Sequence, residues 1–170
     1  MSLTDLAAVM QAHREWVTGW TIVIVEDEPD NLDVVVRLLR FYGASVFTAP
    51  NGEEGFVLIE RERPTFVLTD LSMPVLDGWA LLQRLQSDED LKRIPAIALT
   101  AHAMLGDRER VLEAGFTTYF SKPIDPYDFL LGLLERFPPV RESEPATPII
   151  LSLAEEATEH DDPTPSSPGV

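Results

Sequence analysis

The most constraining feature of this sequence is a regular alternation of short β-branched apolar runs with segments of helical periodicity. Five runs have the length and composition of buried strands, and each is followed by a segment whose apolar residues recur every three or four positions. Helix-ending residues follow several of these segments, as at Gly43, Pro64 and Gly115. The alternation predicts an α/β fold in which helices cover both faces of a parallel sheet.

The sequence also bounds the expected elements. Strands are expected at 21–25, 44–49, 66–69, 96–99 and 118–120, with helices between residue 32 and Gly43 and at 52–62, 79–86, 105–114 and 125–137. Right-handed crossovers leave few strand orders, of which we favour the flavodoxin-like, doubly wound order 2-1-3-4-5 with five helices. Asp125 is expected to cap the last helix, with Pro126 at its first position.

Both ends of the chain depart from this pattern. Apolar residues recur at three- and four-residue steps in residues 1–20, which predicts an amphipathic helix ahead of a domain at 21–137. The pattern fits equally a helix that simply lies on the domain or frays and a helix that mediates docking or dimerisation. Residues 138–170 hold half of the 14 prolines and carry seven acidic residues against one basic residue. They predict a disordered, acidic, proline-rich tail.

Composition limits the partners and the chemistry. The formal net charge is −16, so we expect no direct contact with nucleic acid or anionic membranes and favour protein partners. The sequence has no cysteine, which excludes disulfides and cysteine-based zinc sites. No run approaches the roughly 18 apolar residues that would insert into a membrane, and no secretory signal pattern is present. We therefore expect a cytoplasmic protein.

Reactive side chains follow four of the five expected strands. Glu26 and Asp27 follow the first strand, Asp70 the third, Thr100 the fourth and Lys122 the fifth. Because parallel strands end at one edge of the sheet, these groups are expected to converge there. Carboxylates repel a bare phosphate, but a magnesium ion between them and the phosphate removes that repulsion. Asp70 is then expected to attack phosphorus, while Lys122 neutralises charge and Thr100 donates a hydrogen bond.

Four motifs in combination resemble the response regulator receiver domain family over about residues 21–137. They are Val25-Glu26-Asp27-Glu28-Pro29, Leu68-Thr69-Asp70-Leu71-Ser72-Met73-Pro74 with Asp77-Gly78, Ala98-Leu99-Thr100-Ala101, and Tyr119-Phe120-Ser121-Lys122-Pro123. The resemblance implies a single-domain response regulator of a two-component system, of the chemotaxis-regulator or phosphorelay type. Such a protein accepts a phosphoryl group from a sensor histidine kinase or a histidine phosphotransfer protein. It is a signalling phosphoprotein that assists its own phosphorylation and dephosphorylation, rather than an enzyme.

The resemblance also implies a role for each site residue. Asp70 is the phosphoacceptor, and the Mg²⁺ ligands are Asp27, Asp70, Glu26 and the backbone carbonyl of Ser72. Lys122 and Thr100 contact the phosphoryl group, Thr100 and Tyr119 form the switch, and Lys122-Pro123 resembles the family's cis peptide. Glu26 stands where aspartate is more frequent. Ser72 and His102 occupy positions that influence how fast the phosphoryl group is lost, so its lifetime is open.

Two other functional classes share part of this pattern. An aspartate-nucleophile phosphatase of the haloacid dehalogenase type needs a second acid two residues after the nucleophile, and this position is Ser72. A receiver-like module that is never phosphorylated lacks part of the acidic cluster or the lysine, and this chain has both. We expect too few ordered residues after Phe137 for a helix-turn-helix domain or an enzyme, which favours signalling to a downstream protein target. The cognate kinase, that target and the existence of a homodimer are open.

Overall fold

The computed structural model describes residues 17–28, 30, 32–101 and 107–137. The chain divides into two compact units, Met1–Pro139 and Val140–Val170, and all of the described residues belong to the first unit. The predicted tail at 138–170 and nearly all of the predicted helix at 1–20 lie outside the described residues. No helix in the described part of the chain is long and apolar enough to cross a membrane.

A single sheet of five parallel strands forms the centre of the domain. Its order is β2-β1-β3-β4-β5, which confirms the predicted flavodoxin-like order 2-1-3-4-5. The observed bounds lie within one residue of the expected ones: Thr21–Val25 (β1), Ser45–Ala49 (β2), Phe66–Asp70 (β3), Ala96–Thr100 (β4) and Thr118–Ser121 (β5). The central strands β3 and β4 are buried along their whole length.

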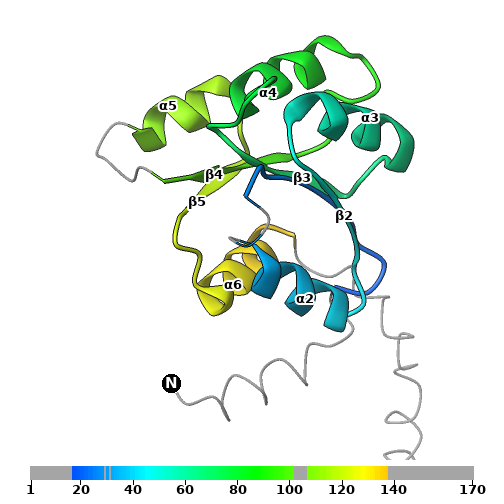
Figure 1. Cartoon of the computed structure of the whole chain (residues 1–170), viewed down its shortest axis with the longest axis vertical. Coiled ribbons are helices and arrows are strands. Elements are labelled where there is room, and N and C mark those ends of the chain that lie inside the picture. The colour runs from blue at the N-terminus through cyan, green and yellow to red at the C-terminus, as the bar shows by residue number, and fades with distance from the viewer. Residues whose placement is uncertain (1–16, 29, 31, 102–106, 138–170) are drawn as a thin grey trace, which may run out of the picture. The chain divides into compact units, whose positions relative to one another are not determined.

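Five helices cover the two faces of this sheet, as predicted. Helices α3, α4 and α5 lie on one face, and α2 and α6 lie on the other (Figure 1). Their bounds are Asp33–Phe41 (α2), Gly52–Glu62 (α3), Gly78–Ser87 (α4), Asp107–Ala114 (α5) and Pro126–Arg136 (α6). The N–H of Asp128 donates to the Asp125 side chain over 3.0 Å, which confirms that Asp125 caps α6. Gly43 follows α2 with a φ of 92°, a left-handed conformation that favours glycine.

The alternation of side chains along β1 explains the two helix layers. Ile22 and Ile24 belong to the apolar core that includes residues of α2 and α6, whereas Val23 and Val25 belong to the core that includes residues of α3 and α4. All four are at most 1% exposed. A strand segment that is buried on both faces is expected to be apolar, and residues 22–25, the buried part of β1, are all isoleucine or valine.

Three aromatic rings pack together at the edge of the sheet where the strands begin. Trp20 lies edge-to-face on Phe66 and on Phe137, with ring centroids 5.5 and 6.2 Å apart, and Phe66 stacks on Phe137 at 4.6 Å. Val17 and Trp20 are both buried, and residues 17–20 form a turn rather than the end of a helix. These two side chains, which the sequence pattern placed in the amphipathic segment, are thus part of the domain core.

Candidate functional site

The reactive side chains gather at the opposite edge, where the strands end. Glu26 and Asp27 follow β1, Asp70 is the last residue of β3, Thr100 is the last residue of β4, and Lys122 follows β5. The N–H of Lys122 donates to the carbonyl oxygen of Thr100 over 2.8 Å, which holds the lysine next to the end of β4. The parallel sheet therefore brings residues from four separate parts of the sequence to one place.

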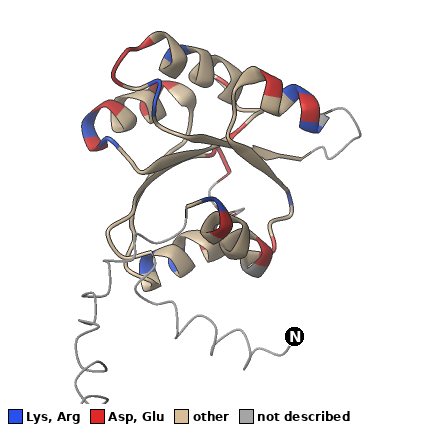
Figure 2. Cartoon of the chain, turned by 180° about the vertical axis from the view of Figure 1, so that it is seen from behind, with Lys and Arg blue, Asp and Glu red and all other residues tan. Residues whose placement is uncertain are grey.

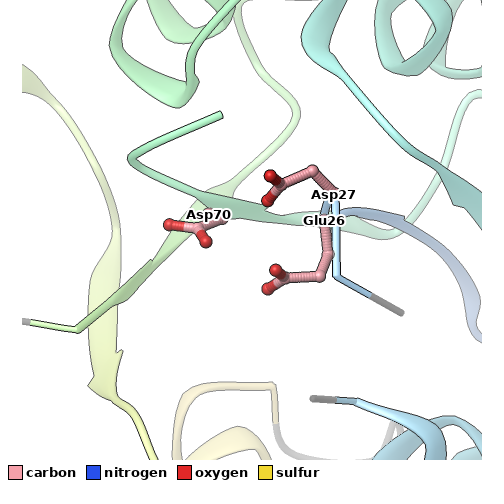
Figure 3. Close-up of side chains that lie close together, drawn as sticks. All are labelled: Glu26, Asp27 and Asp70. Carbon is pink, nitrogen blue, oxygen red and sulfur yellow. The ribbon is translucent and has the colours of Figure 1, made fainter. Parts of the chain in front are cut away.

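Three carboxylates form the acidic part of this site. Glu26, Asp27 and Asp70 each offer an oxygen, and these three oxygens lie within 4.8 Å of one another. Figure 3 shows the side chains of Glu26 and Asp27 at the end of β1 next to that of Asp70 at the end of β3. Figure 2 shows the acidic stretches of these strand ends in red, between the two helix layers. Glu26 and Asp70 are buried, which concentrates negative charge in a region with little water.

One ammonium group lies between two of these carboxylates. Nζ of Lys122 is 2.5 Å from Oδ2 of Asp70, to which it donates a hydrogen bond, and 2.5 Å from Oε2 of Glu26. The side chains of Lys122, Glu26 and Asp70 are only 14, 3 and 11% exposed. These are therefore buried ion pairs, in which each charge depends on its partner.

The environment shifts the pKa values of two of these groups. Burial lowers the pKa of Lys122, but hydrogen bonds and charge interactions with Asp70 and Glu26 outweigh burial and raise it above the ordinary 10.5. Lys122 therefore stays charged. Burial raises the pKa of Glu26 above the ordinary 4.5, with a further rise from the charge of Asp70, and these effects outweigh the lowering by Lys122.

Backbone groups fix the position of Asp70. The N–H of Ser72 donates to Oδ1 of Asp70 over 3.0 Å, so that Lys122 and Ser72 hold the two oxygens separately. Gly78, the first residue of α4, packs against the carbonyl of Asp70 so closely that a Cβ atom would overlap the carbonyl oxygen. The sequence pattern singled out Gly78 only as part of a motif, because this contact depends on the path of the loop after β3.

The two residues predicted to form a switch occupy different environments. Thr100 is 7% exposed at the end of β4, next to the carboxylate cluster in the sheet order. Tyr119 lies on β5 opposite Ala98 and is half-buried against the core formed by residues of β4, α4 and α5. The Lys122-Pro123 bond is cis, as the resemblance implied. His102 lies outside the described residues.

The donor set fits a hard divalent cation. All three acidic groups supply oxygen, the ligand that Mg²⁺ prefers, and the single ammonium of Lys122 leaves their summed charge negative. Oε2 of Glu26 is buried, and the partner that the described residues give it is the ammonium of Lys122, 2.5 Å away. Three carboxylates around one ammonium leave uncompensated negative charge at a buried position, which favours a further cation beside them.

Comparison with known proteins assigns this fold and site to a family. The sequence profile of the response regulator receiver domain matches residues 22–133, and the chain belongs to this family. A 14.6 kDa uncharacterized protein of Leptolyngbya boryana is 40% identical over 116 residues, which span 68% of this chain and 88% of the relative. The polar-differentiation response regulator DivK of Brucella anthropi is 36% identical over 110 residues, which span 65% of this chain and 89% of DivK.

A solved structure shows the same fold. The receiver domain of a sensor histidine kinase from Pseudomonas aeruginosa is 36% identical and superposes with a TM-score of 0.63, covering 71% of this chain and 98% of that domain. That structure holds a magnesium ion in its active site cleft. The chain is therefore a receiver domain of two-component signalling, with additional residues at both ends.

Proposed function

We propose that this receiver accepts a phosphoryl group on Asp70 from the phosphohistidine of a sensor histidine kinase or a histidine phosphotransfer protein. The observation that carries the proposal is the arrangement of Asp70, which ends a strand within 4.8 Å of two further carboxylates and is paired with a buried ammonium. We also propose that the protein acts in the cytoplasm and signals through a downstream protein.

The bonds that form and break in the proposed transfer join Asp70, the phosphoryl group and the donor imidazole. A carboxylate oxygen of Asp70 forms a bond to phosphorus while the phosphorus–nitrogen bond of the phosphohistidine breaks and its electron pair stays on the imidazole. The product is an acyl phosphate on Asp70. Lys122 is already charged and 2.5 Å from Asp70, so it can move to the phosphoryl oxygens without a change of protonation. Attack of water on phosphorus restores the carboxylate and releases phosphate.

Magnesium is proposed as the cofactor of this step. Glu26, Asp27, Asp70 and the backbone carbonyl of Ser72 are the proposed ligands, directly or through water. When bound, Mg²⁺ supplies positive charge that stabilises the charge on the transferring phosphoryl group. Asp27 is more exposed than Glu26 and Asp70. Its carboxylate is therefore the proposed ligand that solvent water can most easily replace.

The proposed output runs through Thr100 and Tyr119. A phosphoryl group adds a charge of roughly −1.5 to −2 beside the ends of β4 and β5, and draws Thr100 and Lys122 toward it. Tyr119 is half-buried, so it can occupy the space that Thr100 leaves. The surface of α5, β5 and α6 then changes shape, as a shift between two existing states of the domain.

Labelling with acetyl phosphate tests the acceptor and the cofactor together. Intact mass should increase by one phosphoryl group in the presence of Mg²⁺ and remain unchanged with excess chelator. Asp70→Asn keeps the volume of the side chain but removes the nucleophilic oxygen, so it should abolish labelling. Asp90→Asn, at an exposed position in the turn after α4, is the matched control and should label normally. Labelling of the Asp70→Asn protein would place the acceptor elsewhere, with Asp27 as the next candidate.

A further inference from the structure

The outward side of α2 carries an apolar stripe that consists of Val34, Leu38 and Phe41. Val34 is 62% exposed and Phe41 is 68% exposed, while Leu38 lies half-buried between them. Spacings of four and three residues place the three side chains on one side of the helix. Five large hydrophobic side chains are exposed in the described part of the chain, and α2 is the element that holds two of them.

The chain enters the domain beside the end of this stripe. Val17 is 2% exposed, and the hydroxyl of Thr18 donates to the carbonyl oxygen of Tyr42 over 3.4 Å. Tyr42 directly follows α2, and its ring lies edge-to-face on Phe41 with centroids 5.2 Å apart. Residues 1–16, which lie outside the described part, are therefore attached close to the end of α2 that carries Phe41.

These residues have an apolar pattern that matches the stripe. Leu3, Leu6 and Met10 follow one another at steps of three and four residues, and His13 and Val17 continue these steps into the domain. We propose that residues 3–16 dock on the stripe of α2 in the same chain. The spacing predicts a helix for this segment, and an amphipathic helix is stable when its apolar side packs on a partner.

The attachment point sets the register of the proposed contact. Both helices advance about 1.5 Å per residue, and both approach the same end of the sheet, at Val17 and at Phe41. Met10 precedes Val17 by the same number of residues as Val34 precedes Phe41, so Met10 is expected to lie level with Val34. Residues 3–6 then reach the loop after β1, at the border of the phosphoacceptor site.

The tether favours this occupant over a second copy of the chain. A segment joined directly to the surface that it covers has an effective concentration in the millimolar range, far above that of a separate molecule. Three side chains also present much less area than the roughly 800 Å² per partner of a stable protein interface. The proposal does not depend on phosphorylation, and can hold or fail independently of the proposed function.

A spin label on α2 tests the contact in the full chain. The sequence has no cysteine, so Arg37→Cys provides a unique attachment site, and the exposed Arg37 side chain lies on the helix beside the stripe. The nitroxide is expected to lower the amide NMR intensities of residues 6–13 by more than half. The reference is the same sample after the nitroxide has been reduced to its diamagnetic form. Phe41→Asp in the same background should restore these intensities, as should Met10→Asp, which leaves the domain core unchanged.

Two controls decide between the alternatives. Leu112→Asp places the same charge at an exposed leucine of α5 and should leave the intensity loss unchanged. In a mixture of isotope-labelled chain without the nitroxide and unlabelled chain with it, the intensities should not fall. A loss of intensity in that mixture would show that a second copy covers α2. If no intensity is lost in the chain that carries both the isotope label and the nitroxide, the segment does not dock on α2. Either result overturns the proposal.

Discussion

Replacement of Lys122 by methionine tests whether its ammonium holds the carboxylates of the site together. Methionine keeps most of the length and apolar character of the lysine side chain but removes the charge. The change leaves Glu26 and Asp70 close together, with side chains 3 and 11% exposed and no cation between them. The two carboxylates then lie at a buried position without a compensating charge, which destabilises the folded state relative to wild type at neutral pH.

The expected loss follows from the burial of the pair. Removal of one partner of a buried ion pair costs about 3–5 kcal/mol, because the other partner stays buried and unpaired. The site lies at the border of the domain and Lys122 is 14% exposed, so water can reach the carboxylates. We therefore expect a loss of about 3 kcal/mol, at the lower end of that range. For a domain of this size, it corresponds to a decrease in Tm of roughly 10 °C.

Urea unfolding at several pH values and Mg²⁺ concentrations gives two further readouts. Without Lys122, the pKa of Glu26 rises further above 4.5, because Lys122 is a group that lowers it. A carboxyl whose pKa is higher in the folded state destabilises the fold above that pKa, and the penalty disappears as the pH falls through it. The stability difference from wild type should therefore shrink as the pH falls toward 4.5. It should also shrink with added Mg²⁺, which replaces the missing positive charge.

Lys92→Met is the matched control. Nζ of Lys92 lies 2.6 Å from Glu89, but the two side chains are 40 and 87% exposed. An exposed pair of this kind contributes little, so the change in unfolding free energy should stay within about 0.5 kcal/mol. If Lys122→Met costs no more than Lys92→Met, or if its cost grows as the pH falls, the electrostatic description of the site is wrong.

Three further predictions address the coupling, the backbone and a helix cap. Thr100→Ala should slow the labelling of Asp70 by acetyl phosphate and remove the phosphorylation-dependent change in hydrogen exchange over α5, β5 and α6. If the phosphorylated variant shows the full wild-type change in hydrogen exchange, the proposed coupling is wrong. Gly78→Ala should cost about 2 kcal/mol in urea unfolding and slow labelling, because its Cβ overlaps the carbonyl of Asp70; normal labelling would show that the loop adjusts freely. Asp77→Ala removes the hydrogen bond from the N–H of Ala80, 2.8 Å long, and should cost about 1 kcal/mol of unfolding free energy. An unchanged urea midpoint would show that water replaces this cap.

The fold was predictable because its strands are buried on both faces. Most residues of such a strand are apolar whichever face they point to, so the runs at 66–68 and 96–99 stand out without any knowledge of their partners. The end of each strand then fixes where the polar residues of the site begin. Local side-chain bonds add precision at some helix ends, as at Asp125, whose type and position already predict the cap.

The boundary at the start of the domain could not be predicted in the same way. Trp20 follows the spacing of the amphipathic segment, and its actual partners, Phe66 and Phe137, are distant in sequence. Periodicity shows that a side chain needs an apolar neighbour, but it does not identify the neighbour. The same limit applies to Lys122, whose placement between Glu26 and Asp70 depends on side-chain conformations rather than on residue type.

The aromatic contact between Trp20 and Phe137 has a consequence for the connectivity of the polypeptide. Their ring centroids are 6.2 Å apart, so the domain begins and ends at nearly the same point, at the edge of the sheet remote from Asp70. A chain whose ends are neighbours can be closed by a short linker and opened elsewhere without a change in strand order. The exposed turn at Glu89 and Asp90 offers new ends. The fold is thus suited to circular permutation, which would bring the reactive edge of the sheet no closer to either terminus.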